Sequence, residues 1–375
     1  MINLVHIITT LDVGGAEIML YKLLGRMSRA RFQHTVIVLA RNGSVGEKIE
    51  QLSIPVLALN LRRGAPNPFA VFKLARELRK LNPDAIQTWM YHADLLGALA
   101  NQLATRAPLA WGIRHSNLDT QHNKRSTLLV AQACARLSHK LPTRIVCNSE
   151  VARVNHVALG YDVSKMLVLP NGFDLAAFQP DLEARSSVRR ELGVLEQTLL
   201  IGLVGRFDPQ KDHRNFIEAA GLLRRAFSNV HFVLCGERIT EENDELAAWI
   251  KAAALEKNIH LLGRRDDVPR LTAAFDIATS SSLGEAFPNV IGEAMACGVP
   301  CVVTDAGDSA MIVGATGRVV PVQNSRALAE AWRELLLLSP EERAYLGQAA
   351  RMRVQEHFAL DKVAKQYEEL YESMA

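Results

Sequence analysis

The sequence predicts an α/β fold made of two doubly wound parallel sheets, one in each half of its 375 residues. Short apolar runs typical of buried strands alternate with segments of helical periodicity along both halves. This alternation, with short turns between the segments, implies parallel strands joined by helical crossovers. Ligands of such sheets bind beyond the carboxyl ends of the strands, so polar residues that follow the apolar runs are the candidates for a site.

The expected strands lie at similar intervals in both halves. They are residues 2–9, 34–40, 55–60, 84–89, 108–114 and 144–148, followed by 199–205, 230–236, 258–262, 275–279 and 300–304. Helical spacing is clear between several of them, as at Phe216, Ala220, Leu223 and Phe227. The boundary between the two halves is expected near residues 170–180.

The composition fits a large enzyme with two domains of ordinary size, since 49% of the residues are apolar and 22% are charged. The five cysteines, at positions 134, 147, 235, 297 and 301, show no paired metal spacing and are expected to be buried thiols in a reducing compartment. The chain lacks a signal-like start and a run of about 18 uncharged apolar residues. These features predict a cytoplasmic protein without a membrane-spanning helix.

The most informative segment runs from residue 285 to residue 300. Pro288 and Asn289 are typical of a helix start, and a Gly-x-Pro sequence marks its end. Glu293 is then expected in the first helical turn and Glu285 on the loop that leads in. Both carboxylates can face one cleft beside a helix N-terminus. The alternative is that Glu293 only complements the helix dipole and Glu285 is a solvated loop charge.

Two other strand ends carry groups suited to phosphate. The run 199–204 ends in a loop with Arg206 and Lys211, which can aim two cations at one point. The first strand is followed by Gly14 and Gly15, where backbone can approach a phosphate at a helix N-terminus. This glycine pair is not the G-x-G-x-x-G fingerprint, which argues against a dinucleotide cofactor. The alternative for the cations is ordinary surface charge.

Together these motifs resemble the retaining glycosyltransferases of the group-1 type (family 4), which have the GT-B fold of two Rossmann-like domains facing across a cleft. The resemblance covers nearly the whole chain, through residues 14–17, 169–174, 206–211, 262–271, 285–293 and 301–304 in the order of the family. It implies an N-terminal acceptor-binding domain at residues 1–172, with residues 360–375 crossing back onto it. Residues 173–359 are then the domain that binds the nucleotide-sugar donor.

The resemblance also implies roles for individual residues. Arg206 and Lys211 match the cations that hold the donor diphosphate. Glu285 matches the glutamate that contacts hydroxyls of the transferred sugar, and Glu293 the one that contacts the ribose. Gly15, beside Gly14, matches the position that lets the first domain come close to the diphosphate.

The resemblance places the rest of the donor around two loops. The backbone of Phe287, Asn289 and Val290 is expected to lie against sugar and phosphate. The loop from Arg264 to Val268 is expected to receive the nucleobase. The chain departs from the family pattern at Ala286, where glycine is usual, so no positive φ is expected there. It also departs at residues 308 and 311 and partly at 235–238.

In the first half, His115 matches a histidine that lies near the acceptor and the leaving sugar in similar enzymes. A satisfied strand-end histidine is the alternative. Tyr91 and His92 are weaker candidates. Arg114 fits either an anionic acceptor or a structural ion pair.

The predicted function is transfer of a sugar from a nucleoside-diphosphate sugar to a glycan or lipid-linked acceptor of cell-surface polysaccharide synthesis. A UDP-sugar is the favoured donor. The resemblance implies a hexosyltransferase that retains the anomeric configuration. No D-x-D cluster lies in a suitable loop, and Asp266-Asp267 is better explained as a helix start, so transfer is expected without metal or cofactor. The alternatives are a sugar-nucleotide epimerase of the same fold and a non-catalytic sugar-nucleotide binding protein.

Charge is unevenly distributed along the chain. Residues 1–180 hold 21 Lys and Arg against 11 Asp and Glu, a net +10, and residues 181–375 hold 22 against 29, a net −7. Part of the positive charge, at Lys73, Arg76, Arg79 and Lys80, lies on an expected amphipathic helix. This predicts peripheral contact with the anionic inner face of the cell membrane. Ordinary solvated charge is the alternative, and nucleic acid is not expected because no aromatic-interleaved basic motif is present.

Overall fold

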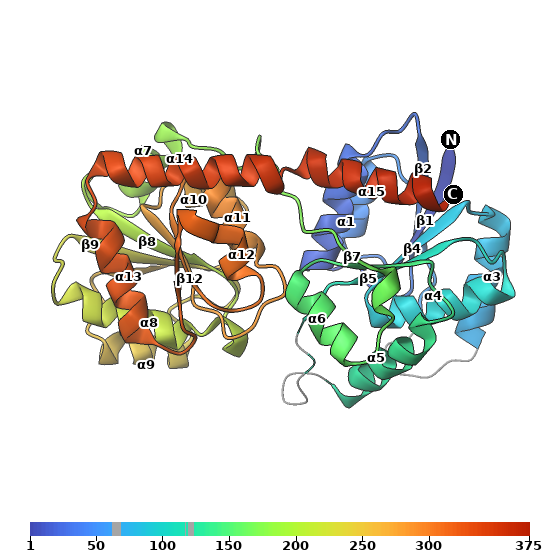
Figure 1. Ribbon diagram of the computed structural model, residues 1–375. Helices are drawn as coiled ribbons and strands as arrows, with labels where there is room; N and C mark the ends of the chain where they lie inside the picture. Colours follow the sequence, from blue (N-terminus) through green and yellow to red (C-terminus); the bar gives the residue numbers. More distant parts are fainter. Residues whose placement is uncertain (62–68, 117, 119–123) are drawn as a thin grey trace. The chain divides into compact units, whose positions relative to one another are not determined.

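The computed structural model describes residues 1–61, 69–116, 118 and 124–375. The chain divides into two compact units, residues 1–172 with 360–375 and residues 173–359. Each unit is a parallel sheet covered by helices on both faces (Figure 1), so the predicted class of two doubly wound sheets is confirmed.

The sheet of the first unit has seven parallel strands in the order β3-β2-β1-β4-β5-β6-β7. Its strands are β1 (Ile2–Ile8), β2 (Phe32–Val38), β3 (Val56–Ala58), β4 (Ala85–Trp89), β5 (Leu109–Ile113), β6 (Arg144–Cys147) and β7 (Met166–Val168). Its helices are α1 (Gly15–Arg26), α2 (Ser44–Gln51), α3 (Phe69–Leu81), α4 (Tyr91–Leu103), α5 (Arg125–Ser138), α6 (Glu150–Ala158) and α15 (Leu360–Met374). A 3₁₀ turn, η1 (Val163–Lys165), precedes β7.

The sheet of the second unit has six parallel strands in the order β10-β9-β8-β11-β12-β13. Its strands are β8 (Leu199–Val204), β9 (Val230–Cys235), β10 (Ile259–Leu261), β11 (Ile277–Ser280), β12 (Cys301–Thr304) and β13 (Arg318–Val320). Its α-helices are α7 (Leu182–Glu191), α8 (His213–Arg224), α9 (Asp244–Ala252), α10 (Val268–Ala273), α11 (Asn289–Ala296), α12 (Ser309–Val313), α13 (Ser325–Leu337) and α14 (Pro340–His357). The 3₁₀ turns η2 (Pro209–Lys211) and η3 (Gly314–Thr316) complete it.

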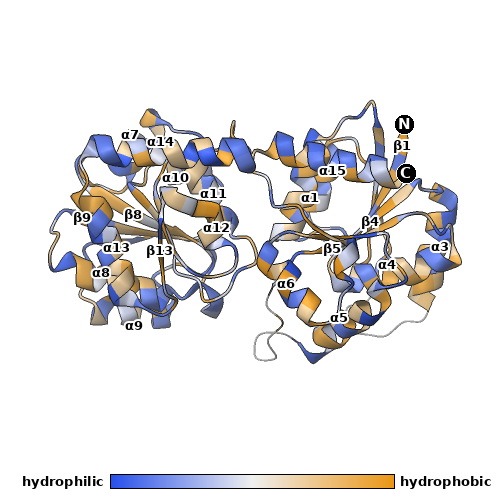
Figure 2. Cartoon of the chain, viewed as in Figure 1, coloured by the Kyte–Doolittle hydropathy of each residue, from blue (hydrophilic) through white to orange (hydrophobic). Residues whose placement is uncertain are grey.

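Alternation along each strand builds one core on each face of its sheet. In β1, Leu4 and Ile8 pack with α1, α2 and α15, while Val5 and Ile7 pack with α3, α4 and α5. The second unit repeats this, with α8, α9 and α13 on one face and α7, α10, α11 and α14 on the other. The strands are accordingly the most uniformly hydrophobic parts of both units (Figure 2).

The strand order reverses between β1 and β4 in the first sheet and between β8 and β11 in the second. At such a switch point neighbouring crossovers run to opposite faces, which leaves a crevice beyond the carboxyl ends of the two strands. Gly14 follows β1, Arg206 and Lys211 follow β8, and Glu285 follows β11. The sequence-predicted residues therefore lie at the switch point of their own sheet.

Several details differ from, or add to, the sequence prediction. The edge strands β7 and β13 were not predicted; each has only three residues, and most of these are only partly buried. All five cysteines are buried and free, as expected. In the described part of the chain, no helix has the length and apolar character that a membrane crossing requires.

Candidate active site at the carboxyl ends of the strands

The loop after β8 is shaped by two aspartates that cap its turns. The carboxylate of Asp208 accepts from the backbone N of Gln210 at 2.9 Å and from Arg206 Nε at 3.0 Å. The carboxylate of Asp212 accepts from Asn215 N at 3.2 Å and so caps α8. The caps hold Arg206 and Lys211 on one ordered turn, with 62% of the Arg206 side chain exposed.

Lys211 and Glu285 form an ion pair that joins the ends of β8 and β11. Lys211 Nζ lies 2.5 Å from Glu285 Oε1, and 24% and 14% of the two side chains are exposed. Ser282 Oγ donates to the same carboxylate oxygen at 2.7 Å. The two loops are also joined by a backbone bond from Leu283 N to Gln210 O at 2.8 Å. A cation and a carboxylate are thus held together at the switch point of the second sheet.

The turn after β12 supports the loop that carries Glu285. Gly307 has φ +57, and a Cβ at this position would lie 2.3 Å from the carbonyl oxygen of Glu285. Asp308 N donates to Ala286 O at 3.1 Å. Ala286 itself has no positive φ, as expected for a residue other than glycine. A larger residue at Gly307 would push the loop and displace the Glu285 carboxylate.

Glu293 does not lie in the first turn of its helix, and the prediction on this point was wrong. Helix α11 begins at Asn289 with Pro288 at the N-cap, so the first turn ends at Gly292 and Glu293 is the fifth residue. Its side chain instead lines a small cavity with Val268 and Val290. The Glu293 carboxylate therefore lies along the side of α11, in its second turn. It does not lie at the N-terminus of the helix, where the helix dipole favours negative charge.

The side chain of Phe287 points into the core of the second unit. Its side chain is buried and stacks on Phe173, with ring centroids 6.0 Å apart, and it packs edge-on against Phe358. Asn289 and Val290 are the first two residues of α11, whose N–H groups lie at the end that favours anions. The buried aromatic cluster fixes where this helix end points.

The loop after β10 is braced by a network that the sequence did not reveal. The guanidinium of Arg265 donates to Asp267 Oδ1 and Oδ2 at 2.7 Å each and also binds Glu191. Arg270 binds the same two carboxylates at 2.8 and 3.0 Å. These cations hold the pKa of Asp267 well below its usual range.

Asp267 precedes α10 as expected, but its carboxylate does not cap the helix because it is bound by the two arginines. Arg264, in contrast, is exposed on the same loop. The braced segment carries Arg264 at one end and Val268, the first residue of α10, at the other.

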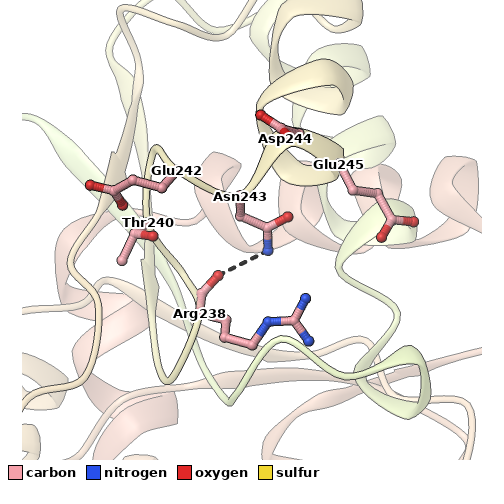
Figure 3. A pocket seen from close by; sticks show the side chains of 6 residues that line it. All are labelled: Arg238, Thr240, Glu242, Asn243, Asp244 and Glu245. Atoms are coloured by element: carbon pink, nitrogen blue, oxygen red, sulfur yellow. Dashed lines mark hydrogen bonds between the residues drawn. The ribbon is translucent and has the colours of Figure 1, made fainter.

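A pocket of about 470 Å³ lies on the neighbouring loop after β9 (Figure 3). Asn243 donates to the carbonyl of Arg238 at 2.9 Å and caps α9. The Arg238 guanidinium lies 5.5 Å from the ring centroid of Phe207, on the loop that holds Arg206. Gly236 is required here, since a Cβ would lie 2.1 Å from Gly205 O.

In the first unit, the glycines after β1 lie at the start of α1. Gly14 is its N-cap in an extended conformation, and a Cβ there would lie 2.3 Å from the Glu17 carboxylate. At Gly15 a Cβ would meet nothing within 4 Å. Glu17 accepts from Thr10 Oγ1 at 3.1 Å, which ties the end of β1 to the helix. Gly15 therefore leaves open space at a helix N-terminus without any strained backbone.

Arg114 and His115 follow β5, and the partners of Arg114 in the structure are neutral groups of the same unit. Its guanidinium donates to Asn171 Oδ1 at 3.1 Å, binds the hydroxyl of Tyr367 and lies 4.4 Å from the ring centroid of Trp89. Arg114 thus links the end of β5 to α15 through hydrogen bonds rather than through an ion pair. His115, the next residue, is half-buried.

His115 has a buried neighbour in His156. Burial, with a smaller contribution from the nearby His115, lowers the pKa of His156 to about 4. His156 Nδ1 lies 2.6 Å from Ala152 O, and its Nε2 lies 2.7 Å from the hydroxyl of Tyr91. A carbonyl can only accept, so Nδ1 carries the proton and Nε2 accepts from Tyr91. Tyr91 is therefore a core residue, whereas His92 is exposed.

Two residues at the carboxyl edge of the first sheet escaped the sequence analysis. Met90 has φ 72 and ψ 156, a conformation that costs about 1–3 kcal/mol for a residue with a side chain. Asp94 is fully buried and accepts from Thr88 Oγ1 at 2.5 Å and from Gly112 N at 3.2 Å. Burial raises the pKa of Asp94 to about 7. Neither residue belongs to a local motif, so only the fold reveals them.

Comparison with known proteins gives a consistent family. The model described as "Glycosyltransferase Family 4" matches residues 13–177, and the model described as "Glycosyl transferases group 1" matches residues 198–337. The chain is 28% identical to the UDP-Gal:alpha-D-GlcNAc-diphosphoundecaprenol alpha-1,3-galactosyltransferase of Escherichia coli, over 69% of this chain and 67% of the relative. It is 26% identical to the N,N'-diacetylbacillosaminyl-diphospho-undecaprenol alpha-1,3-N-acetylgalactosaminyltransferase of Campylobacter jejuni, over 90% of both chains.

The fold is also that of solved glycosyltransferase structures. Anabaena HepE in complex with UDP superimposes with a TM-score of 0.86 at 25% identity, over 99% of this chain and 100% of HepE. A Rickettsia africae glycosyltransferase superimposes with a TM-score of 0.85 at 18% identity, over 100% and 98%. Two Rossmann-like domains with these neighbours define the GT-B fold. The chain belongs to the group-1 glycosyltransferases.

Proposed function

We propose that the protein is a retaining hexosyltransferase that moves a sugar from a UDP-sugar to a lipid-linked glycan during cell-surface polysaccharide synthesis. Two relatives named above act, by their names, on diphosphoundecaprenol-linked sugars, and one uses UDP-Gal. The solved structure of HepE holds UDP. These names support the class of donor and acceptor, and the residues of this chain supply a chemical reason for the donor.

The observation that carries the proposal is the Lys211–Glu285 pair at the switch point of the second sheet. A nucleotide sugar offers each member a better partner. Its diphosphate attracts Lys211 and Arg206, and the hydroxyls of its sugar donate to Glu285. Residues 173–359 are thus the proposed donor domain, and residues 1–172 with 360–375 the proposed acceptor domain.

The proposal assigns the other parts of the donor to α11 and to the loops around it. Glu293 binds the ribose from the side of α11, and the backbone of Phe287, Asn289 and Val290 faces the sugar and phosphate. The braced segment from Arg264 to Val268 receives the nucleobase. Gly15, next to Gly14, gives the acceptor domain a side-chain-free approach to the diphosphate.

Catalysis in this proposal depends on stabilising the departing diphosphate. Arg206, Lys211 and the N-terminus of α11 supply positive charge where negative charge develops, and no metal is required for that task. The acceptor oxygen bonds to the anomeric carbon on the face from which the diphosphate departs, so the configuration is retained. The departing phosphate oxygen accepts the proton of the acceptor hydroxyl. His115 lies near the acceptor and the leaving sugar.

The test is an acceptor-dependent assay of UDP release with UDP-galactose, UDP-glucose and their N-acetyl forms, using short-chain diphosphate-linked glycans as acceptors. The proposal requires UDP release and a new glycoside in equal amounts. An epimerase would convert the UDP-sugar without an acceptor and release no UDP. A binding protein would raise its melting temperature with a UDP-sugar and turn over nothing.

A further inference from the structure

Helix α3 presents two phenylalanines and a row of cations on its exposed side. Its core side is formed by Ala70, Leu74, Ala75 and Leu78, which are all buried. On the other side, Phe69 and Phe72 are 74% and 60% exposed. A soluble helix usually turns phenylalanine toward its core, so two exposed rings in the first turn are an apolar patch that calls for an explanation.

The cations of α3 lie on the same side as the rings. Helical spacings of three and four residues from Phe69 and Phe72 reach Lys73, Arg76 and Lys80, all exposed. Glu77, which is only partly exposed, pairs with Arg76 at 3.2 Å and with Lys80 at 2.9 Å. With Arg79, the helix holds four Lys and Arg against one Glu, a net +3. We call Phe69, Phe72, Lys73, Arg76 and Lys80 the α3 face.

The neighbouring helix extends this surface. Arg79 donates to the carbonyl of Leu103 at the end of α4, which places the two helix ends side by side. Leu99 and Leu103 are exposed one turn apart on α4. Arg106, just beyond α4, is also exposed. Exposed apolar residues and exposed cations therefore lie on adjoining parts of α3 and α4, which are neighbours in the first unit (Figure 1).

We propose that the α3 face docks on an anionic lipid bilayer, with Phe69 and Phe72 inserted among the acyl chains at the level of the headgroups. The occupant follows from the chemistry of the face. Amphipathic helices that lie in the membrane interface combine exposed aromatic side chains with flanking lysine and arginine, and anionic headgroups attract those cations. A soluble acidic partner would satisfy the cations, but a bilayer satisfies both the cations and the rings.

Docking deepens the proposed function, because an acceptor linked to a lipid is held in a bilayer. It does not depend on that function, since vesicle binding is measured without transfer. The α3 face contains none of the residues assigned to the donor or the acceptor, so its variants are expected to leave transfer to a soluble acceptor unchanged.

The experiment measures co-flotation of the full chain with vesicles of phosphatidylcholine and of phosphatidylcholine with phosphatidylglycerol, at low and high salt. We expect binding only to the anionic vesicles, and weaker binding as salt rises. Arg76→Gln with Lys80→Gln should weaken it about fivefold for each cation removed. Phe69→Ser with Phe72→Ser should weaken it about tenfold or more, even at low salt.

Matched controls come from exposed residues of the second unit. Lys251→Gln with Lys257→Gln removes two exposed cations from a different surface, and Met352 is 60% exposed, as is Phe72. Phe72→Trp should shift its emission to the blue on vesicle binding and be quenched by brominated acyl chains, whereas Met352→Trp should do neither. This readout reports insertion directly.

Three results would overturn the proposal. One is failure of the wild type to bind anionic vesicles at low salt. The second is binding that the α3 variants leave unchanged. The third is loss of transfer to a soluble acceptor in folded α3 variants, which would make the face part of the acceptor site. Vesicle binding without any transfer would instead leave docking intact and contradict the proposed function.

Discussion

Replacing Glu285 by glutamine separates the two halves of the Lys211–Glu285 pair. In the structure the carboxylate holds Lys211 Nζ at 2.5 Å, so a diphosphate must compete with it for the lysine. Glutamine keeps the size and the hydrogen bond from Ser282 but removes the negative charge. UDP lacks the transferred hexose whose hydroxyls Glu285 would bind, so it should then meet less competition for Lys211.

The magnitude follows from the geometry of the pair. A hydrogen bond to a charged group contributes about 1.5–3 kcal/mol, and the pair is less than a third exposed, so solvent screens it only in part. Glutamine removes the charge but keeps an oxygen that accepts from Lys211, so we use the lower end of this range. About 1.4 kcal/mol is tenfold in affinity. Because the amide still accepts from Lys211, Glu285→Gln should bind UDP as well as the wild type or up to about tenfold more tightly. Its kcat/KM with a UDP-sugar should fall by about 10²–10³.

Lys211→Met is the contrasting variant. It removes the charge that the diphosphate needs, so it should weaken UDP and UDP-sugar together by tenfold or more. Lys251→Met, an exposed lysine on α9, serves as the control and should change neither. Titration calorimetry with UDP and steady-state assays of UDP release give the two quantities. If Glu285→Gln weakens UDP as strongly as Lys211→Met, competition within the pair is not what the carboxylate does.

Three further predictions concern the phosphate cation, the chemistry and acid stability. Arg206→Ala should lower kcat/KM by about 10²–10³ with an unchanged melting temperature, because this side chain lies mostly in solvent; near-normal turnover would remove it from the site. Transfer should survive EDTA and give a product with the donor's anomeric configuration, as read from the anomeric proton coupling. Loss of activity that Mg²⁺ or Mn²⁺ restores would refute metal independence. An inverted coupling would refute retention. Burial, with Arg29 nearby, lowers the pKa of His34 from 6.5 to about 4, so the unfolded chain binds the extra proton and stability falls as pH drops through that window. In urea unfolding, the loss between pH 7 and pH 5 should be up to about 2 kcal/mol smaller for His34→Gln; equal losses would contradict the assignment.

The sequence predicts the parts of the site that depend on local patterns. The run that forms β8 is continuously apolar and ends abruptly in Arg206 and Lys211, so strand and loop could both be placed. The pairing of Lys211 with Glu285 joins residues 74 positions apart and needed the strand order, which composition and spacing do not contain. The start of α11 was placed correctly, but Glu293 is the fifth residue counted from Asn289 and therefore falls in the second turn, not the first.

Other features have no local signal at all. Arg114 binds Tyr367, 253 positions later, so the sequence around either residue contains no pattern that predicts the contact. Met90 has a positive φ, a conformation that sequence analysis expects at glycine, and the turn around Met90 contains no glycine. The edge strands β7 and β13 were missed, although β3 and β10, which also have three residues each, lie within predicted runs. Tertiary contacts decide each of these cases.

The ion pair also bears on how a transferase of this kind would release its product. With a nucleotide sugar bound, the diphosphate compensates Lys211 and the sugar hydroxyls compensate Glu285. Once the sugar has moved to the acceptor, the site would hold UDP, and the partly buried Glu285 carboxylate would have lost the hydroxyls of the transferred sugar. Glu285 would then compete again for Lys211, and this competition would weaken the hold on the leaving nucleotide. The same competition explains the tighter binding of UDP expected for Glu285→Gln. In that variant the carboxylate no longer competes with the diphosphate for Lys211.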